Sequence, residues 1–411
     1  MNLQNLRENY PKLLSHMEED GYSRHYIIKI KTEIRRVLAK ADEERWVSYA
    51  DIYRDYAERL KPSSNMRMKL TSLGIIEHFD LYGHYPNGQR RQEIVKRGKY
   101  CLLNQEFRSV IDHYSAVEKE RGKKDSTIKG ESQNAACFMF SLQQAGYDSL
   151  DKITEAAVLS FFVSPDGKPY RSHSYKKNIA AVFKACIPTD PEIFNRILAF
   201  LPALREKRKN IQYLKPEEVE AIKKMFANED ASISLRDKAI GVLALYTGLR
   251  SCDIAGLTIN DIDWAADRIY INQQKTEVPL GLPLTATVGN AIFDYLRQER
   301  PETDIKYIFI SNNRPYGRLK DKSVGNISQK IMDAANVRQT PGNRRGFHIF
   351  RHHLATEMLG NDVPQPVISR VVGHTAPDSL EPYLNADFKH LKECALSIER
   401  YPMPEGVLGD A

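Results

Sequence analysis

The sequence predicts a mainly helical protein of several domains, with a small antiparallel sheet embedded in its C-terminal half, an α+β arrangement. With 411 residues the chain is too long for one ordinary core, so two or three domains are expected. Most of the chain up to residue 200 spaces its apolar residues as helices do. Two stretches, 259–271 and 278–284, alternate apolar and polar residues as strands do, and helical spacing returns from Val324.

Two helical blocks precede these strands. The first covers residues 10–100 and is broken by a turn-rich stretch at 82–88. The second covers residues 105–200 and is broken by the sequence Ser-Pro-Asp-Gly at 164–167. Its apolar patterns at 126–128, 138–142 and 150–162 fit helices. We therefore expect two helical modules ahead of the domain that contains the sheet.

The third block begins with a helix at Pro216, because a proline followed by two acidic residues favours the first turn of a helix. Residues 239–246 are almost wholly apolar and predict a buried helix. The strands follow, with a turn at 265–267 between the first two. This order, in which a three-stranded sheet lies between two sets of helices, is typical of an α+β domain.

The composition argues against a membrane-spanning or secreted protein. An apolar fraction of 42% and a charged fraction of 27% are typical of a globular chain. No apolar run approaches the roughly 18 residues that a membrane helix needs, and the first residues lack a secretory signal. The five cysteines are far apart, without a Cys-x-x-Cys pair, which favours a reducing interior. These features predict a cytoplasmic location and no membrane partner.

Basic residues gather in clusters, although the formal net charge of +7 is modest. In the first 100 residues, 19 Lys and Arg face 14 Asp and Glu. Such clusters suit nucleic-acid phosphates, because each neutralised phosphate releases counterions. For any single cluster the alternative is a solvated loop. The clusters that we consider as candidate DNA contacts contain Arg205, Lys207, Arg208 and Lys209, and later Arg344 and Arg345.

Six reactive side chains follow one another in the last third of the chain. In order, they are Arg250, Lys275, His348, Arg351, His374 and Tyr383. The first five can bind or protonate a phosphate, and the last can attack it. Arginine suits a phosphoryl transition state, because its planar fork binds oxyanions in a bidentate manner and keeps its charge at any working pH. His348 and Arg351 are three residues apart, so on a helix they project from one face.

Arg250 stands between two apolar stretches, 239–245 and 254–257, where an unpaired guanidinium would be costly. Two partners are open for it: an internal ion pair with Asp253, and a DNA phosphate. Both can hold together if Asp253 orients the guanidinium and the phosphate completes the site.

Four short motifs resemble the catalytic signature of the tyrosine recombinase (phage integrase) family. They are Thr-Gly-Leu-Arg-Ser-Cys-Asp at 247–253, His-Ile-Phe-Arg at 348–351, Gly-His at 373–374, and Tyr383 nine residues later. The resemblance covers roughly residues 105–400. It implies a core-binding domain at 105–204, a linker at 205–212 and a catalytic domain at 213–411 that ends in an exchange helix. Residues 1–100 would form an additional helical module, and its partner is left open between arm sites, other DNA and a protein.

The family's reaction implies that Tyr383 cleaves one DNA strand, leaving a 3′-phosphotyrosine and a free 5′-hydroxyl that attacks a partner strand. Because bond energy is conserved, no ATP is implied, and the sequence shows no P-loop and no metal-binding cage, so no cofactor is expected. A tyrosine with the ordinary pKa of ~10 is ionised only to about one part in a thousand at pH 7, so it needs help. His348 is the candidate base, His374 the donor to a non-bridging oxygen and Lys275 the acid for the leaving oxygen. Asp253 stands where the family more often has Glu.

A zinc site is the main alternative for the histidines, because His348 and His352 have the spacing of zinc-binding helices. A zincin needs Glu directly after the first His, and this chain has Ile349 there. We therefore expect no metal site. Two other interpretations stay open: a type IB topoisomerase, which uses the same set of groups without defined sites, and a catalytically silent DNA-binding regulator on the same scaffold.

Double-stranded DNA is the expected partner. The family acts as a tetramer on two DNA sites and exchanges a C-terminal helix between neighbours. An apolar stripe within residues 388–398 fits such a helix, and the alternative is that the stripe packs on its own domain. Accessory DNA-bending or directionality proteins are further expected partners. The resemblance implies a site-specific integrase of a mobile genetic element that is associated with the nucleoid when bound to DNA.

Overall fold

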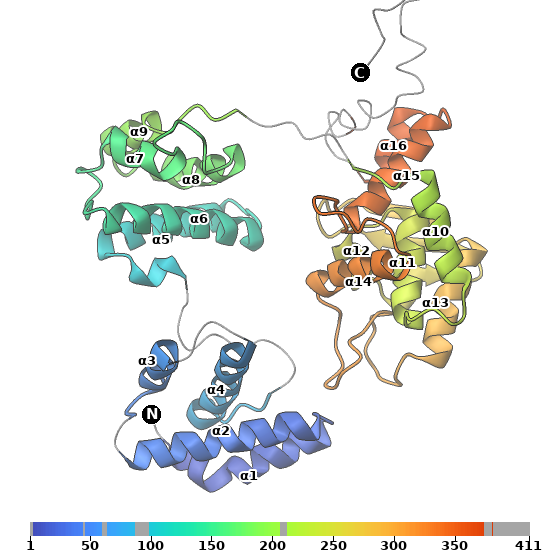
Figure 1. Cartoon of the computed structure of the whole chain (residues 1–411), viewed down its shortest axis with the longest axis horizontal. Coiled ribbons are helices and arrows are strands. Elements are labelled where there is room, and N and C mark those ends of the chain that lie inside the picture. Colours follow the sequence, from blue (N-terminus) through green and yellow to red (C-terminus); the bar gives the residue numbers. More distant parts are fainter. Residues whose placement is uncertain are drawn as a thin grey trace, which may run out of the picture. The chain divides into compact units, whose positions relative to one another are not determined.

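The computed structural model describes residues 3–43, 46–59, 64–86, 98–205, 212–373 and 380. Most of the chain before residue 209 forms one compact unit, and most of the chain after it forms a second. Among the described residues, helices dominate both units and a single three-stranded antiparallel sheet lies in the second (Figure 1). The predicted fold class, mainly α with a small antiparallel sheet, is confirmed.

Four helices form the N-terminal part: α1 (Gln4–Glu19), α2 (Arg24–Asp42), α3 (Tyr49–Arg59) and α4 (Ser64–Tyr82). Two carboxyl groups are buried among their apolar side chains, and each accepts a hydrogen bond from a tyrosine. The Tyr49 hydroxyl donates to Asp80 at 2.9 Å, and the Tyr56 hydroxyl donates to Glu33. Burial raises the pKa of both carboxyls. The tyrosine hydroxyls therefore satisfy polar groups that would otherwise be costly to bury.

The next part comprises the 3₁₀ helix η1 (Lys99–Leu102) and the helices α5 (Gln105–Glu120), α6 (Asp125–Gln144), α7 (Glu155–Phe162), α8 (His173–Cys186) and α9 (Pro191–Ala199). These helices share one core, in which the Phe138 ring contacts the rings of Phe161, Phe162 and Phe183. The pattern at 150–162 predicted a longer helix than α7. The helix begins only at Glu155 because the Thr154 hydroxyl accepts the N–H of Ala157 and caps it.

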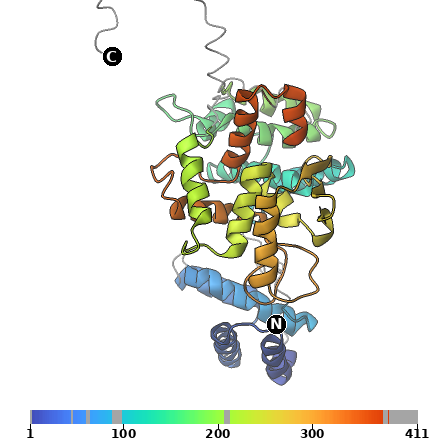
Figure 2. The same ribbon diagram turned by 90° about the vertical axis from the view of Figure 1, so that its right-hand side faces the viewer.

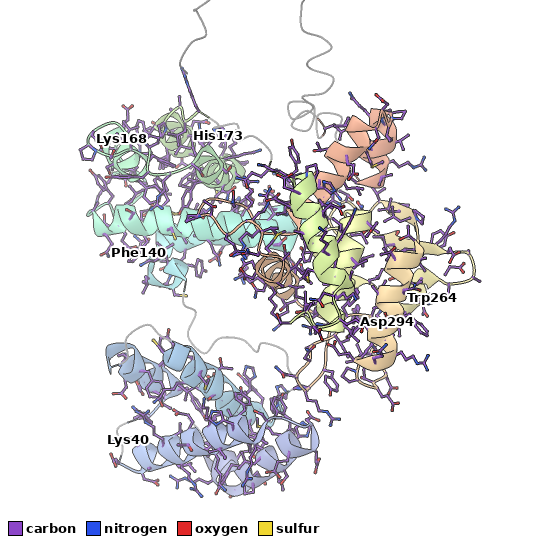
Figure 3. The ribbon with its side chains drawn as sticks, turned by 45° about the vertical axis from the view of Figure 1, so that its right-hand side comes forward. Lys40, Phe140, Lys168, His173, Trp264 and Asp294 are labelled. Carbon is purple, nitrogen blue, oxygen red and sulfur yellow. The ribbon has the colours of Figure 1, made fainter. Side chains whose placement is uncertain are left out.

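Polar side chains also set where α8 begins and where the chain leaves α9. Ser172 accepts the N–H of Tyr175 and so caps α8. His173, labelled in Figure 3, places Nδ1 2.9 Å from the carbonyl oxygen of Leu204. This contact holds the segment that follows α9 against the start of α8.

The second unit contains α10 (Pro216–Ala227), α11 (Leu235–Thr247), α12 (Ser251–Gly256), η2 (Ile259–Asp261), β1 (Ile262–Asp263), β2 (Arg268–Asn272), β3 (Pro279–Pro283), α13 (Ala286–Gln298), α14 (Asp321–Ala334), α15 (His348–Gly360) and α16 (Gln365–Val371). The predicted start at Pro216 is confirmed, and Glu218 accepts the Lys215 N–H at 2.8 Å. Helix α11 contacts α13, α14 and α15. It is buried as predicted for 239–246, except that Tyr246 is 41% exposed.

The sheet has the order β1-β2-β3, with both pairs antiparallel. Ile269 pairs with Leu282 and Ile271 with Leu280, and all four side chains are buried. This confirms the predicted alternation in the second and third strands. The first strand was predicted from residue 259, but residues 259–261 form η2, because Thr258 and Asp261 form a capping box there. Trp264, in the turn between β1 and β2, lies beside Gly289 of α13 (Figure 3).

The last helices of the described chain lie side by side in both views (Figures 1 and 2). Ala355 and Leu359 of α15 share a small core with Ile368 of α16 and with Val372. Gly373 follows directly at a φ of +61°, a conformation that favours glycine. In the described part of the chain, no helix is long and apolar enough to cross a membrane.

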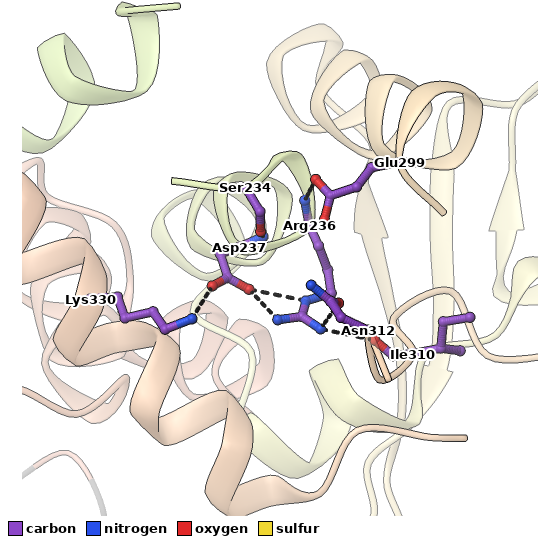
Figure 4. A network of polar contacts seen from close by, with 7 residues as sticks. All are labelled: Ser234, Arg236, Asp237, Glu299, Ile310, Asn312 and Lys330. Atoms are coloured by element: carbon purple, nitrogen blue, oxygen red, sulfur yellow. Dashed lines mark hydrogen bonds and ion pairs between the residues drawn. The ribbon is translucent and has the colours of Figure 1, made fainter. Parts of the chain in front are cut away.

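A buried ionic network anchors the start of α11 (Figure 4). Asp237 accepts hydrogen bonds from Arg236 at 3.0 and 2.7 Å and from Lys330 of α14 at 3.0 Å. Arg236 also donates to the carbonyl oxygen of Ile310 at 3.1 Å and to Asn312. The carboxylate of Asp237 therefore joins the N-terminus of α11 to α14. Through Arg236, it also joins α11 to the part of the chain that follows α13.

Candidate active site

A sharp corner between α11 and α12 places Arg250. Gly248 ends α11 in the left-handed region, at a φ of +60°, with its N–H donating to Ala244 at 3.0 Å. A Cβ on this glycine would lie 3.0 Å from the side chain of Leu354 and 3.5 Å from the Cα of Arg351. Only glycine fits this corner without strain, and Arg250 then directly precedes α12.

The Arg250 guanidinium is held by two neutral acceptors. Nη1 donates to Oε1 of Gln273 and Nη2 to the carbonyl oxygen of Gly373, each at 2.9 Å. The ion pair with Asp253 was one of the two partners left open for Arg250, and among the described residues no ion pair joins the two side chains. Asp253 is buried and faces the turn after β2, where its Oδ1 accepts the N–H of Gln274 at 2.8 Å. Asp253 therefore fixes that turn.

Lys275 lies, as predicted, in the turn between the second and third strands, and it is exposed. Two backbone hydrogen bonds close this turn. The N–H of Gln273 donates to Val278 at 3.0 Å, and the N–H of Glu277 donates to Gln273 at 2.7 Å. The turn presents the lysine at its tip.

Helix α15 supplies the next two predicted groups. His348 is its first residue, and Arg351 follows one turn later, as their spacing predicts. Arg351 is only 4% exposed, and its Nη1 donates to the carbonyl oxygen of Gly248 at 3.1 Å. The arginine is thus tied to the same corner that positions Arg250.

The electrostatics of His348 show that four cationic groups lie near it. The pKa of His348 is lowered, first by desolvation of the ring and then by the positive charges of Arg351, Lys275, Arg250 and Arg344. These cations come from three stretches of the chain, since Arg344 and Arg351 lie on either side of His348 in the sequence. The fold therefore brings three of the other predicted reactive groups, with Arg344 in addition, near the His348 imidazole.

The remaining predicted residues divide into three groups. His374 and Tyr383 lie outside the described residues, as do Lys207, Arg208 and Lys209 of the proposed linker and the segment 388–398. Arg205 and Arg344 are exposed. Arg345 forms an ion pair with Asp333 and donates to the carbonyl oxygen of Gln329, so its charge is engaged within the protein.

Sequence reasoning missed the groups that hold the two arginines. They are the side chain of Gln273 and the carbonyl oxygens of Gly373 and Gly248. A signal for Gln273 existed, because the inward alternation of Ile269 and Ile271 continues to position 273. Backbone carbonyl partners leave no comparable trace in a sequence.

Comparison with known proteins identifies the family. The phage integrase family matches residues 212–390. An integrase/recombinase of Sinorhizobium fredii, y4gC, is 37% identical over 185 residues, which are 45% of this chain and 94% of that protein. The chain belongs to the phage integrase family of tyrosine recombinases. Tyrosine recombinase XerA of Pyrococcus furiosus is 28% identical over 176 residues, 43% of this chain and 58% of XerA.

Coverage of these relatives is uneven. The chain spans 94% of y4gC but 40% of a second Sinorhizobium fredii integrase/recombinase, y4rF, to which it is 30% identical. Two solved tyrosine recombinases share the fold. XerH bound to difH substrate has a TM-score of 0.55 at 18% identity and covers 67% of this chain and 81% of XerH. The lambda integrase tetramer on a Holliday junction has a TM-score of 0.52 at 17% identity and covers 70% and 84%.

The electrostatics of this tyrosine recombinase give a direct prediction for His348. In an NMR titration, its pKa should lie below that of an ordinary histidine, and Arg344→Gln should move it upward, because one repelling charge is removed. His353 is an internal control: its pKa is also lowered by desolvation, but Arg344 is not among the causes. An unchanged His348 pKa in the variant would contradict the proximity of these two groups.

Proposed function

We propose that this tyrosine recombinase cuts and rejoins DNA at specific sites through a 3′-phosphotyrosine formed by Tyr383, without ATP or metal. In this proposal Arg250 and Arg351 bind the non-bridging oxygens of the scissile phosphate, together with His374. Lys275 protonates the leaving 5′ oxygen. The reaction balances because the P–O bond to the 5′ oxygen breaks as the P–O bond to tyrosine forms, and the later attack by a 5′-hydroxyl reverses this exchange.

One observation carries the proposal: the charges of four cations, from three stretches of the chain, act on His348. Fixed positive donors are what the transition state of phosphodiester transfer demands, because negative charge spreads over its non-bridging oxygens. Desolvation, and then the same cations, lower the pKa of His348 and favour the neutral imidazole, which supports its role as the base that accepts the proton of tyrosine. A phosphate is an anion whose charge and oxygen atoms match the donors of these cations.

A nicked duplex tests the proposal. A suicide substrate with a nick beside the crossover loses a short fragment after cleavage, so the covalent intermediate is trapped. With substrates selected by binding from a randomised pool, the full-length protein should form an adduct that survives denaturing electrophoresis, in the presence of EDTA and without ATP. Absence of any adduct from bound duplexes would overturn the proposal. Relaxation of supercoiled plasmids that lack the selected site would instead favour a topoisomerase.

Arg250→Lys should lower the rate of cleavage at saturating DNA by about 10²–10³-fold, since removing one oriented donor from a transition state has effects of that order. DNA affinity should change little, because lysine keeps the charge but lacks the fork. Single-turnover cleavage and fluorescence anisotropy measure the two quantities. Arg297→Lys, on the exposed last turn of α13, is the matched control. Weakened binding with normal cleavage would mean that Arg250 has no role in the transition state.

We further propose the domain assignment implied by the family: a helical module at 1–100, a core-binding domain at 105–204, a linker at 205–212 and a catalytic domain at 213–411. The partners are two duplex DNA sites held by a homotetramer, with accessory DNA-bending or directionality proteins. We place the protein in the cytoplasm, at the nucleoid when it is bound to DNA. Sedimentation of the protein with its selected duplex tests the tetramer.

The exposed face of α2 supports DNA binding by the first module. Arg24, Lys31 and Arg35 occupy one face at helical spacing, and none of them forms an ion pair with a described residue. The acid on this stretch of helix, Glu33, is buried. The salt dependence of DNA binding is the slope of the logarithm of affinity against the logarithm of salt concentration, and each phosphate contact adds to it. Replacing the three basic residues with alanine should reduce this slope by the contribution of about three phosphate contacts. An unchanged salt dependence would place the DNA elsewhere.

A further inference from the structure

Gln273 lies at the junction of three segments of the candidate active site. It follows β2, and its side chain points inward in continuation of Ile269 and Ile271, so that only 1% of the residue is exposed. A buried carboxamide must be hydrogen-bonded to be tolerated.

Its oxygen accepts two hydrogen bonds. Nη1 of Arg250 donates to Oε1 at 2.9 Å, and the hydroxyl of Thr276 donates to the same atom at 2.7 Å. The orientation of the carboxamide is determined by the first of these bonds, because a guanidinium has only donors and the oxygen must therefore face it. Thr276 directly follows Lys275. One oxygen atom thus joins Arg250 to the turn that carries the lysine.

The third segment is the end of α16. A Cβ on Gly373 would lie only 2.0–2.4 Å from the carboxamide atoms of Gln273, so the glycine backbone packs directly against this side chain. The Gly373 carbonyl oxygen accepts the second donor of Arg250 at 2.9 Å. Gln273, Arg250 and Gly373 therefore form a closed set of contacts, and His374 is the next residue in the chain.

The chemistry of the partner matters as much as its position. An arginine has five N–H donors, and the two contacts with Gln273 and Gly373 engage two of them, which leaves three for an oxyanion. Both acceptors are neutral. A carboxylate in place of the amide would hold the guanidinium equally well but would neutralise the charge that a phosphate needs. An amide orients the arginine and leaves its charge available.

We propose that Gln273 is a positioning residue that holds Arg250 in register with the turn bearing Lys275 and leaves the charge of the guanidinium free for the scissile phosphate. The inference rests on the proposed function, and it assigns to Gln273 a role in the cleavage step without contact to DNA.

The test compares three variants of the full-length protein on the suicide substrate, at saturating DNA and in a single turnover. Gln273→Leu removes the acceptor at similar size and should slow cleavage by about 10–100-fold, the effect of losing one hydrogen bond to a charged group. Its Kd for the intact duplex should stay within about threefold of wild type. Gln273→Glu keeps the acceptor, adds a charge and should also slow cleavage. Gln274→Leu is the control, because that exposed side chain faces Arg318 and should leave the rate unchanged.

A double-mutant cycle separates positioning from a general structural role. In an Arg250→Ala background, followed over long incubations, Gln273→Leu should change the residual rate by less than about twofold, because the group on which it acts is gone. An equal loss in both backgrounds would overturn the inference, as would wild-type rates for Gln273→Glu. If wild type itself forms no adduct, the proposed function fails; if wild type cleaves and Gln273→Leu cleaves as fast, only the inference fails.

Discussion

Tyr383→Phe is expected to abolish the covalent protein–DNA adduct completely while DNA affinity stays within about twofold. The substitution removes one oxygen atom, and without that oxygen no phosphodiester exchange can form a bond to residue 383. Phenylalanine retains the ring, so the substitution changes only the hydroxyl group. Electrophoresis on the suicide substrate measures the adduct, and anisotropy with the same duplex measures binding.

Specific controls are needed because the chain contains 21 tyrosines. Tyr316 precedes the His-Ile-Phe-Arg sequence, and Tyr401 lies well beyond the Gly-His pair, so both depart from the order of the family's signature. Tyr316→Phe and Tyr401→Phe should each form the adduct at the rate of wild type. If the adduct persists in Tyr383→Phe and disappears in one of the controls, the nucleophile is the tyrosine replaced in that control. Peptide mapping of the wild-type adduct gives the same answer without mutation.

Asp237→Ala should produce the largest loss of stability, about 3–5 kcal/mol in the free energy of unfolding of the second unit. The residue is 2% exposed, and its carboxylate is the anionic partner of the buried Arg236. Removal of one partner leaves a buried charge without compensation, which costs far more than the net value of the pair. Asp237 also lies in the first turn of α11, where a negative charge favours the helix. For a unit of about 200 residues the expected fall in Tm is roughly 6–20 °C.

Lys330→Ala separates the contribution of the buried Asp237–Arg236 ion pair to stability from that of the more exposed Asp237–Lys330 pair. Lys330 binds the same carboxylate, but 64% of its side chain is exposed, so its loss should cost under about 1 kcal/mol. Thermal unfolding followed by circular dichroism gives the global effect, and amide hydrogen exchange of α11 locates it. Equal losses for Asp237→Ala and Lys330→Ala would contradict the importance of burial.

Local patterns predicted much of the fold. The start at Pro216, the buried helix at 239–246 and the two paired strands follow from capping residues and from the period of apolar residues, which act over a few neighbours. The helix expected from residue 150 was predicted too long, because an apolar pattern does not show that Thr154 caps the helix and starts it at Glu155. The spacing of His348 and Arg351 was predicted for the same local reason.

The partner of Arg250 could not be obtained in this way. Asp253 was the nearest acid in the sequence, but α12 turns it toward Gln274, and the guanidinium reaches Gln273 and Gly373 instead. These contacts join residues 23 and 123 positions apart. Sequence proximity ranks candidate partners by distance along the chain, whereas hydrogen bonds depend on distance in space.

The sequence alone determined which reactive groups this tyrosine recombinase carries, the order in which they occur and the helices and strands that bear them, because residue type and short-range periodicity are written in the chain itself. Only the tertiary structure decided that Arg250 and Lys275 come near the imidazole of His348, and that a neutral amide holds Arg250. The physical reason is that burial and charge interactions arise between distant segments, and their geometry exists only after the helices have packed.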